Sequence, residues 1–436
     1  MSITSDVTKM KQISPYVAAL SCEKRNAALL AIADALEKAA DEIFAENKKD
    51  LDLAEENGVA PAVKKRLKFD EGKLSDVTKG LRGLAQLEDP IGKVTLHREL
   101  DSDLELTRIT CPIGVIGVIF EARPDAMIQI ASLCIKSGNC AVLKGGKETA
   151  NSNRYIFDII NKTAIENGFP EGGLCLAETH SQIDELLTCD RYVDLIIPRG
   201  SNAFVRHIMD NTKIPVMGHA DGICHIYVDK SADQEMAVRI IKDAKMQYTA
   251  ACNAVETLLV NQEIADTFIP LLYNELKAEG ITLRGTGRVK EILDSAKDKL
   301  SYDTEGFEVI NTDEFPEYLS LTASVAVVDG VDQAIEHINR YGSHHTDSII
   351  TMDDEAAERF MQLVDSAGVY RNCSTRFSDG FRYGFGAEVG ISTGKIHARG
   401  PVGLEGLVTY KYKLIGNGQT VGDYASGKRT FNFKDI

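Results

Sequence analysis

The sequence predicts an α/β protein with two doubly wound domains, each built on a parallel sheet with helices on both faces. Short apolar strands alternate with helical segments from residue 113 to residue 229, and a second alternating series runs from residue 232 to residue 372. Regular strand–helix repetition is typical of parallel sheets with crossover helices. The chain has 436 residues, which is too long for one hydrophobic core and favours two domains.

The N-terminal part is predicted to be helical, because apolar residues recur at three- and four-residue spacing across 17–51. A long β-hairpin is expected at 92–110, where two alternating segments flank Asp101, Ser102 and Asp103. Pro124 opens a helix that Gly138 ends. The first series has strands at 113–120, 140–144, 174–179, 193–199 and 224–229, with helices at 124–138, at 150–167, after 179 and from Asn202.

The second series has helices at 232–246, 262–279, 331–341 and 353–364, and strands at 255–260, 324–328, 347–351 and 368–372. We therefore place the domain boundary near residue 230. The first domain comprises 1–94 and 111–229, the second comprises 230–403, and an arm comprises 95–110 and 404–420. The arm contains an alternating strand at 405–415, and a strand with no partner in its own domain favours pairing with another chain. The arm is predicted to serve oligomerisation.

Composition excludes several classes of function. The formal net charge is -16 and the sequence pI is near 5.1, whereas nucleic-acid and membrane-surface binding need a basic footprint. No signal segment and no apolar run of membrane-spanning length is present. The nine cysteines form an odd set without CxxC pairs, which fits a reducing compartment. We expect a soluble, cytoplasmic protein.

Three apparent motifs fail on inspection. "GTGRVK" at 285–290 lacks the third glycine of a dinucleotide fingerprint and the preceding parallel strand that the fingerprint needs. "GISTGK" at 390–395 is one residue short of a phosphate loop. His344 and His345 are adjacent, so their side chains point in different directions and cannot share a metal on one helix face. We predict no metal site.

A resemblance rests on longer stretches. "PIGVIGVIF" and "SGNCAVLKGGKETANSN" resemble the cofactor half of the aldehyde dehydrogenase superfamily, "IIPRGS" resembles its turn beneath the nicotinamide, and "YTAACNAVETLLV" resembles its catalytic segment. "VDGVDQAIEHINRYGSHHTDSI" and "STRFSDGFRYGFGAEVGISTGKIHARGPVGLEGL" resemble the branch that reduces an acyl phosphate. The resemblance covers nearly the whole chain. It implies an aldehyde dehydrogenase-like fold with a cofactor-binding first domain and a catalytic second domain.

The same resemblance implies an activity. It is the NADPH-dependent reduction of L-glutamyl 5-phosphate to L-glutamate 5-semialdehyde, with release of phosphate, in proline biosynthesis. It also implies a homodimer or homotetramer and functional coupling to glutamate 5-kinase. Two rival functions stay open: an oxidising aldehyde dehydrogenase that hydrolyses its thioester, and a catalytically silent nucleotide-binding or scaffold protein on the same fold.

Cys252 is the expected nucleophile by its place in the catalytic segment. Phosphate is a good leaving group and sulfur is strongly nucleophilic, so a thiolate attacks an acyl phosphate to form a thioester that accepts hydride. Ala250 and Ala251 would let ligands approach the sulfur, whereas the alternative is a buried filler cysteine. The backbone amide of Cys252 or the side chain of Asn253 is expected to donate to the oxyanion.

Cofactor contacts are expected at both domains. Lys144 ends a strand, at the sheet edge where ligands bind in open α/β sheets, and by resemblance it holds the adenosine ribose. Lys147 falls where NAD-using relatives carry a glutamate, and an ammonium there would pair with the 2′-phosphate of NADPH. Gly200 and Ser201 open a helix whose amides face the pyrophosphate or form an ordinary N-cap. By resemblance Glu317 binds the nicotinamide ribose, whereas the alternative is a solvated loop carboxylate.

Substrate-binding candidates are mainly arginines, because guanidinium suits both the carboxylate and the phosphate of the substrate. Each of them has a surface ion pair as the alternative. His219 is a further candidate, while His337 is expected to pack or cap and His345 lies in a branch-specific stretch. The arginine candidates are Arg123, Arg376, Arg382 and Arg399.

Two residues of oxidising relatives are missing here. Those relatives use a glutamate to activate the water that cleaves the thioester, and His219 stands in its place in "GHADGICHIYVD". They also carry an oxyanion-binding asparagine where this chain has Ala122 in "FEARPDA". His219 or Asp221 could still act as a base. The missing glutamate favours a reductase, because hydrolysis would waste an activated substrate.

Overall fold

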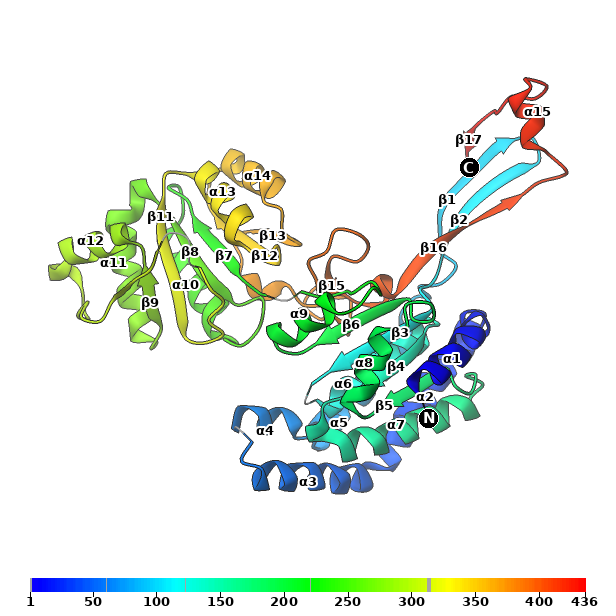
Figure 1. Cartoon of the computed structure of the whole chain (residues 1–436). Helices are drawn as coiled ribbons and strands as arrows, with labels where there is room; N and C mark the ends of the chain where they lie inside the picture. The colour runs from blue at the N-terminus through cyan, green and yellow to red at the C-terminus, as the bar shows by residue number, and fades with distance from the viewer. Residues whose placement is uncertain (1, 60, 122, 220, 312–314) are drawn as a thin grey trace. The chain divides into compact units, whose positions relative to one another are not determined.

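The computed structural model describes residues 2–59, 61–121, 123–219, 221–311 and 315–436. The chain divides into two compact units (Figure 1). Unit 1 comprises Met1–Gly218, Phe385–Gly390 and Val402–Ile436, and unit 2 comprises His219–Gly384 and Ile391–Pro401. Within the described residues, no helix combines the length and apolarity needed to span a membrane.

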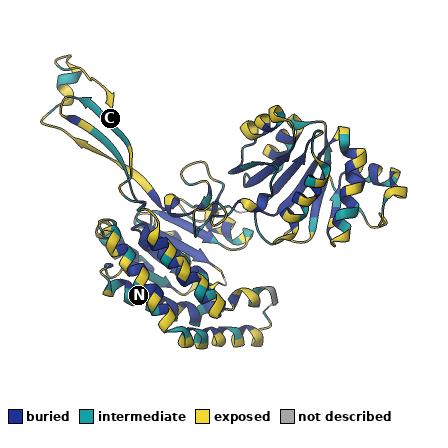
Figure 2. Ribbon diagram, turned by 180° about the vertical axis from the view of Figure 1, so that it is seen from behind, coloured by how far each residue is buried: buried dark blue, intermediate teal, exposed yellow. Residues whose placement is uncertain are grey.

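Unit 1 contains a four-stranded parallel sheet in the order β5-β4-β3-β6. Helices α1 and α8 contact each other on one face of this sheet. Helices α6 and α7 pack on the other face, and α2, α3 and α5 pack against them as an outer layer. Both faces are covered, so the strands are mostly buried, as the doubly wound prediction requires (Figure 2). The strands are β3 (Val115–Phe120), β4 (Cys140–Lys144), β5 (Leu174–Ala177) and β6 (Leu195–Arg199). The α-helices are α1 (Ile3–Ala18), α2 (Cys22–Lys38), α3 (Ala40–Glu56), α4 (Pro61–Leu67), α5 (Glu71–Gln86), α6 (Pro124–Lys136), α7 (Ala150–Glu166), α8 (His180–Leu187) and α9 (Asn202–Asp210).

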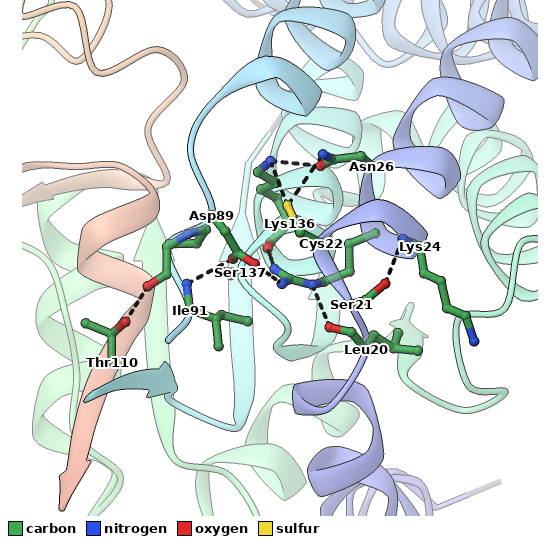
Figure 3. Close-up of polar contacts among 12 residues, drawn as sticks. Leu20, Ser21, Cys22, Lys24, Asn26, Asp89, Ile91, Thr110, Lys136 and Ser137 are labelled. Atoms are coloured by element: carbon green, nitrogen blue, oxygen red, sulfur yellow. Dashed lines mark hydrogen bonds and ion pairs between the residues drawn. The ribbon is translucent and has the colours of Figure 1, made fainter. Parts of the chain in front are cut away.

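A buried polar cluster ties the helices of unit 1 together (Figure 3). Lys136, the last residue of α6, donates from Nζ to Asn26 Oδ1 and to Leu87 O, each at 2.8 Å. Arg25 on α2 donates to Lys136 O and forms an ion pair of 2.7 Å with Asp89. Burial lowers the pKa of Lys136. These contacts satisfy the polar groups where α2, α6 and the segment 87–93 after α5 meet.

Unit 2 contains a seven-stranded sheet in the order β10-β9-β11-β8-β7-β12-β13, whose strand pairs are all parallel. One apolar core joins the sheet to α10, α11 and α12, and a second joins it to α13 and α14. The strands are β7 (Cys224–Val228), β8 (Val255–Asn261), β9 (Thr282–Gly285), β10 (Glu308–Val309), β11 (Thr322–Val328), β12 (Thr346–Ile350) and β13 (Gly368–Arg371). The helices are α10 (Gln234–Met246), α11 (Gln262–Ala278), α12 (Gly287–Ser295), α13 (Val331–Tyr341) and α14 (Asp354–Leu363).

Two sequence expectations differ from the structure of unit 2. The boundary lies between Gly218 and His219 rather than near residue 230, because the strand at 224–228 pairs with β8 and β12 instead of closing the first sheet. The segment at 285–290 does follow a parallel strand, since β9 pairs with β11 directly before α12. The expected absence of a parallel strand before "GTGRVK" is therefore wrong, although the third glycine is still missing.

The arm sequence forms an antiparallel sheet in the order β16-β2-β1-β17. The hairpin is present, but the strand near 405–415 is not left without a partner, because β16 pairs with β2 along its whole length. The elements are β1 (Val94–Asp101), β2 (Leu104–Pro112), β16 (Val408–Ile415), α15 (Val421–Ala425) and β17 (Lys434–Asp435). Among the described residues, the remaining strands are β14 (Gly390–Ser392) and β15 (Gly400–Val402). Oligomerisation through the arm stays a prediction.

Candidate active site

Cys252 lies on the loop between α10 and β8, at the amino-terminal edge of the sheet of unit 2. Strands β8, β7 and β12 are neighbours and run parallel. The residues that precede these strands therefore gather at the same edge. Cys252 is half-buried, and each of the nine cysteines is described in the structure as a free thiol.

His345, directly before β12, contacts Cys252. Its Nε2 lies 3.2 Å from Cys252 Sγ, and its Nδ1 lies 3.0 Å from Thr346 Oγ1. The ring is fully buried and held from both sides. An imidazole at this distance is placed to take the proton of the thiol, which leaves the nucleophilic thiolate. The sequence placed His345 only in a branch-specific stretch and did not pair it with Cys252.

His219 joins the same cluster. Its Nδ1 lies 2.8 Å from Ile391 O, and its ring meets that of His345 edge-on with centroids 4.8 Å apart. Ligand atoms of His219, Cys252 and His345 all lie within 4.8 Å of one another. The residue that stands in the place of the missing glutamate thus lies beside the thiol. No metal site is predicted from the sequence, but the structure brings together three side chains that could hold a metal ion.

Gly222, which lies just before β7, packs against the Cys252 loop. A Cβ added to Gly222 would lie 2.3 Å from Cys252 O and 2.6 Å from Cys252 Cα. Its amide donates to Glu317 Oε1 at 3.0 Å. Gly222 therefore allows the Cys252 loop to pack closely against a loop that also receives Glu317.

We expect Gly222→Ala to lower by about 10²-fold the rate of any reaction in which the Cys252 sulfur attacks a substrate, because displacement of an attacking atom by about 1 Å costs that much. Steady-state kinetics of the purified variant measure the effect. Gly287→Ala is the matched control, since a Cβ there meets nothing within 4 Å. Equal turnover in Gly222→Ala and wild type would show that the close packing of the loop does not position the sulfur.

A second cysteine beside the site is inert. Cys224 Sγ donates to Cys252 O at 3.3 Å and is fully buried. Burial, followed by the nearby Asp347, raises the pKa of Cys224 well above its usual range. Cys224 therefore stays protonated and serves as packing and as a weak donor to the catalytic loop.

Asn253 and Arg376 fix the other side of the loop. Asn253 Nδ2 donates to Ser378 O at 2.7 Å, and Arg376 donates from Nε and a terminal nitrogen to Gln247 Oε1 at 2.9 and 2.7 Å. One hydrogen of the Asn253 side-chain amide therefore holds the Cys252 loop against Ser378. Burial, followed by the charge of Arg382, lowers the pKa of Arg376, while the charge of Cys252 acts in the opposite direction. A thiolate at Cys252 would therefore favour the charged form of Arg376.

The other substrate candidates are distributed differently. Arg382 is exposed and donates to Arg376 O. Arg399 instead pairs with Asp365 at 3.0 Å, and Lys395 with Arg399 hold the pKa of Asp365 below its usual value. Arg123 is exposed in unit 1, and Ala122 lies outside the described residues. The structure thus brings Arg376 and Arg382 together and shows Arg399 in an ion pair.

A buried ion pair joins the two elements that flank the Cys252 loop. Lys245 Nζ lies 2.6 Å from Glu256 Oε2 and 3.0 Å from Val255 O, and both side chains are at most 1% exposed. Burial raises the pKa of Glu256 to about 7 and lowers that of Lys245. Because removing one partner of such a pair costs about 3–5 kcal/mol, this pair holds α10 and β8 on either side of Cys252 in a fixed relation.

In unit 1, Lys144 ends β4 as expected and is 3% exposed, with its ammonium donating to Gly145 O. Burial lowers the pKa of Lys144. Asn153 is buried beside Gly145, and its Oδ1 has no hydrogen-bond partner in the described structure. Lys147 is exposed at the start of the 3-10 turn Lys147–Thr149. A buried cation and an unsatisfied buried acceptor at the end of β4 fit a polar ligand.

The N-terminus of α9 is already capped by a carboxylate. Glu121 Oε2 accepts from the amide of Ser201 at 3.2 Å, and a Cβ at Gly200 would lie 2.8 Å from the Glu121 carboxyl carbon. The side chain of Ser201 makes no capping bond. The carboxylate of Glu121, rather than the side chain of Ser201, therefore satisfies this amide, and a phosphate at this helix terminus would have to replace Glu121.

Comparison with known proteins defines the class. The model of the Aldehyde dehydrogenase family matches residues 2–282. Gamma-glutamyl phosphate reductase of Pelotomaculum thermopropionicum is 52% identical over 436 residues, covering 100% of this chain and 98% of the relative. The crystal structure of gamma-glutamyl phosphate reductase from Thermotoga maritima matches with a TM-score of 0.91 and 35% identity, covering 96% of this chain and 100% of that one. A glyceraldehyde-3-phosphate dehydrogenase from Methanocaldococcus jannaschii, solved with NADP, matches with a TM-score of 0.65 and 17% identity, covering 95% and 94%.

The chain therefore belongs to the aldehyde dehydrogenase family, and its aldehyde dehydrogenase-like fold is confirmed. Within that family it belongs with the gamma-glutamyl phosphate reductases, which resemble it at about half identity over its full length. It is an oxidoreductase, as the sequence indicated.

Proposed function

We propose that this chain reduces L-glutamyl 5-phosphate to L-glutamate 5-semialdehyde with release of phosphate, using NADPH, in proline biosynthesis. The observation that carries the proposal is the contact of 3.2 Å between Cys252 Sγ and His345 Nε2. Relatives at 52% and 53% identity bear the name of this activity. The proposal includes a cytoplasmic homodimer or homotetramer assembled through the arm, and functional coupling to glutamate 5-kinase.

The first half of the reaction needs a thiolate and a leaving group. His345 takes the proton of Cys252, the sulfur attacks the acyl carbon, and the bond from that carbon to the phosphate oxygen breaks. Phosphate leaves with the electron pair of that bond, and a thioester on Cys252 remains. Arg376, which donates to Gln247 at the start of the Cys252 loop, and Arg382, which donates to Arg376 O, supply positive charge for the anionic substrate.

In the second half, the thioester carbon on Cys252 would accept the hydride that NADPH would supply when bound. Donors near Cys252, including its own backbone amide, stabilise the oxyanion of the thiohemiacetal. The carbon–sulfur bond then breaks, which releases the aldehyde and restores the thiolate. The protein's task is to orient the sulfur and to keep water from the thioester.

The residues of unit 1 fit a dinucleotide. Lys144 offers a buried ammonium and Asn153 an unsatisfied buried Oδ1, both next to the glycines that follow β4. Gly145 is required there, because a Cβ would lie 2.0 Å from Asn153 Nδ2. We propose that Lys144 and Lys147 hold the adenosine end, that Gly200 and Ser201 face the pyrophosphate once Glu121 moves, and that Glu317 binds the nicotinamide ribose.

Lys147→Glu tests the preference for NADPH. Lys147 is exposed and would pair with the 2′-phosphate, whereas a carboxylate would repel it. We expect the ratio of kcat/KM for NADPH to that for NADH to fall by roughly 10- to 100-fold, the value of one charged hydrogen bond. Lys162→Glu, on α7, controls for a change of net charge. Wild-type protein that uses both cofactors equally would remove this role of Lys147.

Dependence on phosphate tests the proposed function itself. We expect the reverse reaction, oxidation of the semialdehyde with NADP⁺, to require inorganic phosphate, because phosphate rather than water resolves the thioester. Cofactor reduction and glutamate formation are measured with and without phosphate. Comparable rates without phosphate would support the oxidising dehydrogenase instead, and no turnover under either condition would support a silent protein.

A further inference from the structure

We infer that Cys252, His219 and His345 form a binding site for Zn²⁺, at which the ion reversibly blocks the enzyme. The ligand atoms of the three residues lie within 4.8 Å of one another. One thiolate and two imidazoles are the ligand types that zinc prefers, and three protein ligands leave its fourth tetrahedral position for water.

The distances are close to those that coordination requires. Zinc bonds of about 2.3 Å to sulfur and about 2.0 Å to nitrogen separate neighbouring ligand atoms by roughly 3.5 Å. Cys252 Sγ and His345 Nε2 are already 3.2 Å apart. The most distant pair of ligand atoms, at 4.8 Å at most, must close by roughly 1 Å, and this pair includes the half-buried His219.

Both imidazoles are oriented as metal ligands usually are. Ile391 O can only accept, so His219 Nδ1, 2.8 Å away, carries the hydrogen and the neutral ring has its lone pair on Nε2. His345 Nδ1 lies 3.0 Å from Thr346 Oγ1, while its Nε2 faces the sulfur. Metal-binding histidines typically donate from one ring nitrogen to a carbonyl or similar acceptor, which fixes the ring and directs the other nitrogen to the ion.

Zinc bound here would take the electron pair of the Cys252 sulfur and displace the proton of the thiol. The inhibitory part of the inference rests on the proposed function, in which that sulfur is the nucleophile. Binding of the ion does not, because it needs only the three side chains. A chelator would remove the ion and restore the thiolate.

The test titrates the full-length protein with Co²⁺, whose bond to a thiolate gives a charge-transfer absorption band, and then displaces it with Zn²⁺. We expect one ion per chain and protection of Cys252 from iodoacetamide that a chelator reverses. Cys252→Ala should remove the band. His219→Ala should weaken Zn²⁺ binding by about 10-fold or more. His344→Asn is the matched control, because His344 has a φ of 59°, which asparagine tolerates, and lies outside the cluster.

Absence of the band from wild-type protein would overturn the site, and so would equal Zn²⁺ affinity in wild type, Cys252→Ala and His219→Ala. A band accompanied by reversible loss of reductase activity supports both parts of the inference. Binding without loss of activity would keep the metal site, overturn the inhibition, and show that the proposed role of Cys252 is wrong. An active reductase that binds no Zn²⁺ would leave the proposed function intact and reject the site.

Discussion

Replacing Cys252 by alanine is expected to lower reductase activity by about 10⁴-fold or more, because the nucleophile and the thioester are lost together. Cys252 is the thiol that contacts His345 Nε2, at 3.2 Å, and its loop is fixed by Gly222 and Asn253. Alanine removes one sulfur from a half-buried position, so folding should be little affected. Steady-state reduction of L-glutamyl 5-phosphate measures the loss, and NADPH binding, measured separately by fluorescence, should stay near normal.

Cys373→Ala is the matched control for this prediction. Cys373 is also half-buried and lies in the same unit, but burial raises the pKa of its thiol. A protonated thiol is a poor nucleophile, so the control should keep its activity. Substantial turnover by Cys252→Ala, or equal losses in the two variants, would remove Cys252 from the mechanism.

Many of the parallel strands could be predicted from local patterns of apolar residues. The strands at 115–120, 140–144 and 195–199 are apolar runs between helical segments, and runs of this kind mark parallel strands buried on both faces. The spacing of apolar residues does not reveal β9, because the four residues "TLRG" are too few to show a period. It also misplaced the strand at 224–228, since the choice of sheet depends on tertiary pairing with β8 and β12.

The site was predictable only where one short segment carries the chemistry. Cys252 stands out in "YTAACNAVETLLV", but His345 is 93 residues away and meets it only because β12 lies two strands from β8 in a parallel sheet. The signal that was available is positional: each residue comes just before a buried strand, and the starts of parallel strands share an edge. The ion pair of Arg399 with Asp365 has no such local signal.

His345→Ala is expected to lower turnover by about 10²–10³-fold, the usual contribution of a positioned proton acceptor. The ring is fully buried and its Nε2 lies 3.2 Å from Cys252 Sγ, so the variant loses the base and leaves a cavity of imidazole size. Added imidazole should enter that cavity and restore part of both the turnover and the rate of Cys252 alkylation by iodoacetamide. His345→Gln, which fills the space without a basic nitrogen, should be equally slow but not rescued. If imidazole rescues neither rate, or if His345→Gln is as active as wild type, the ring serves packing and Cys252 loses its proton to another group.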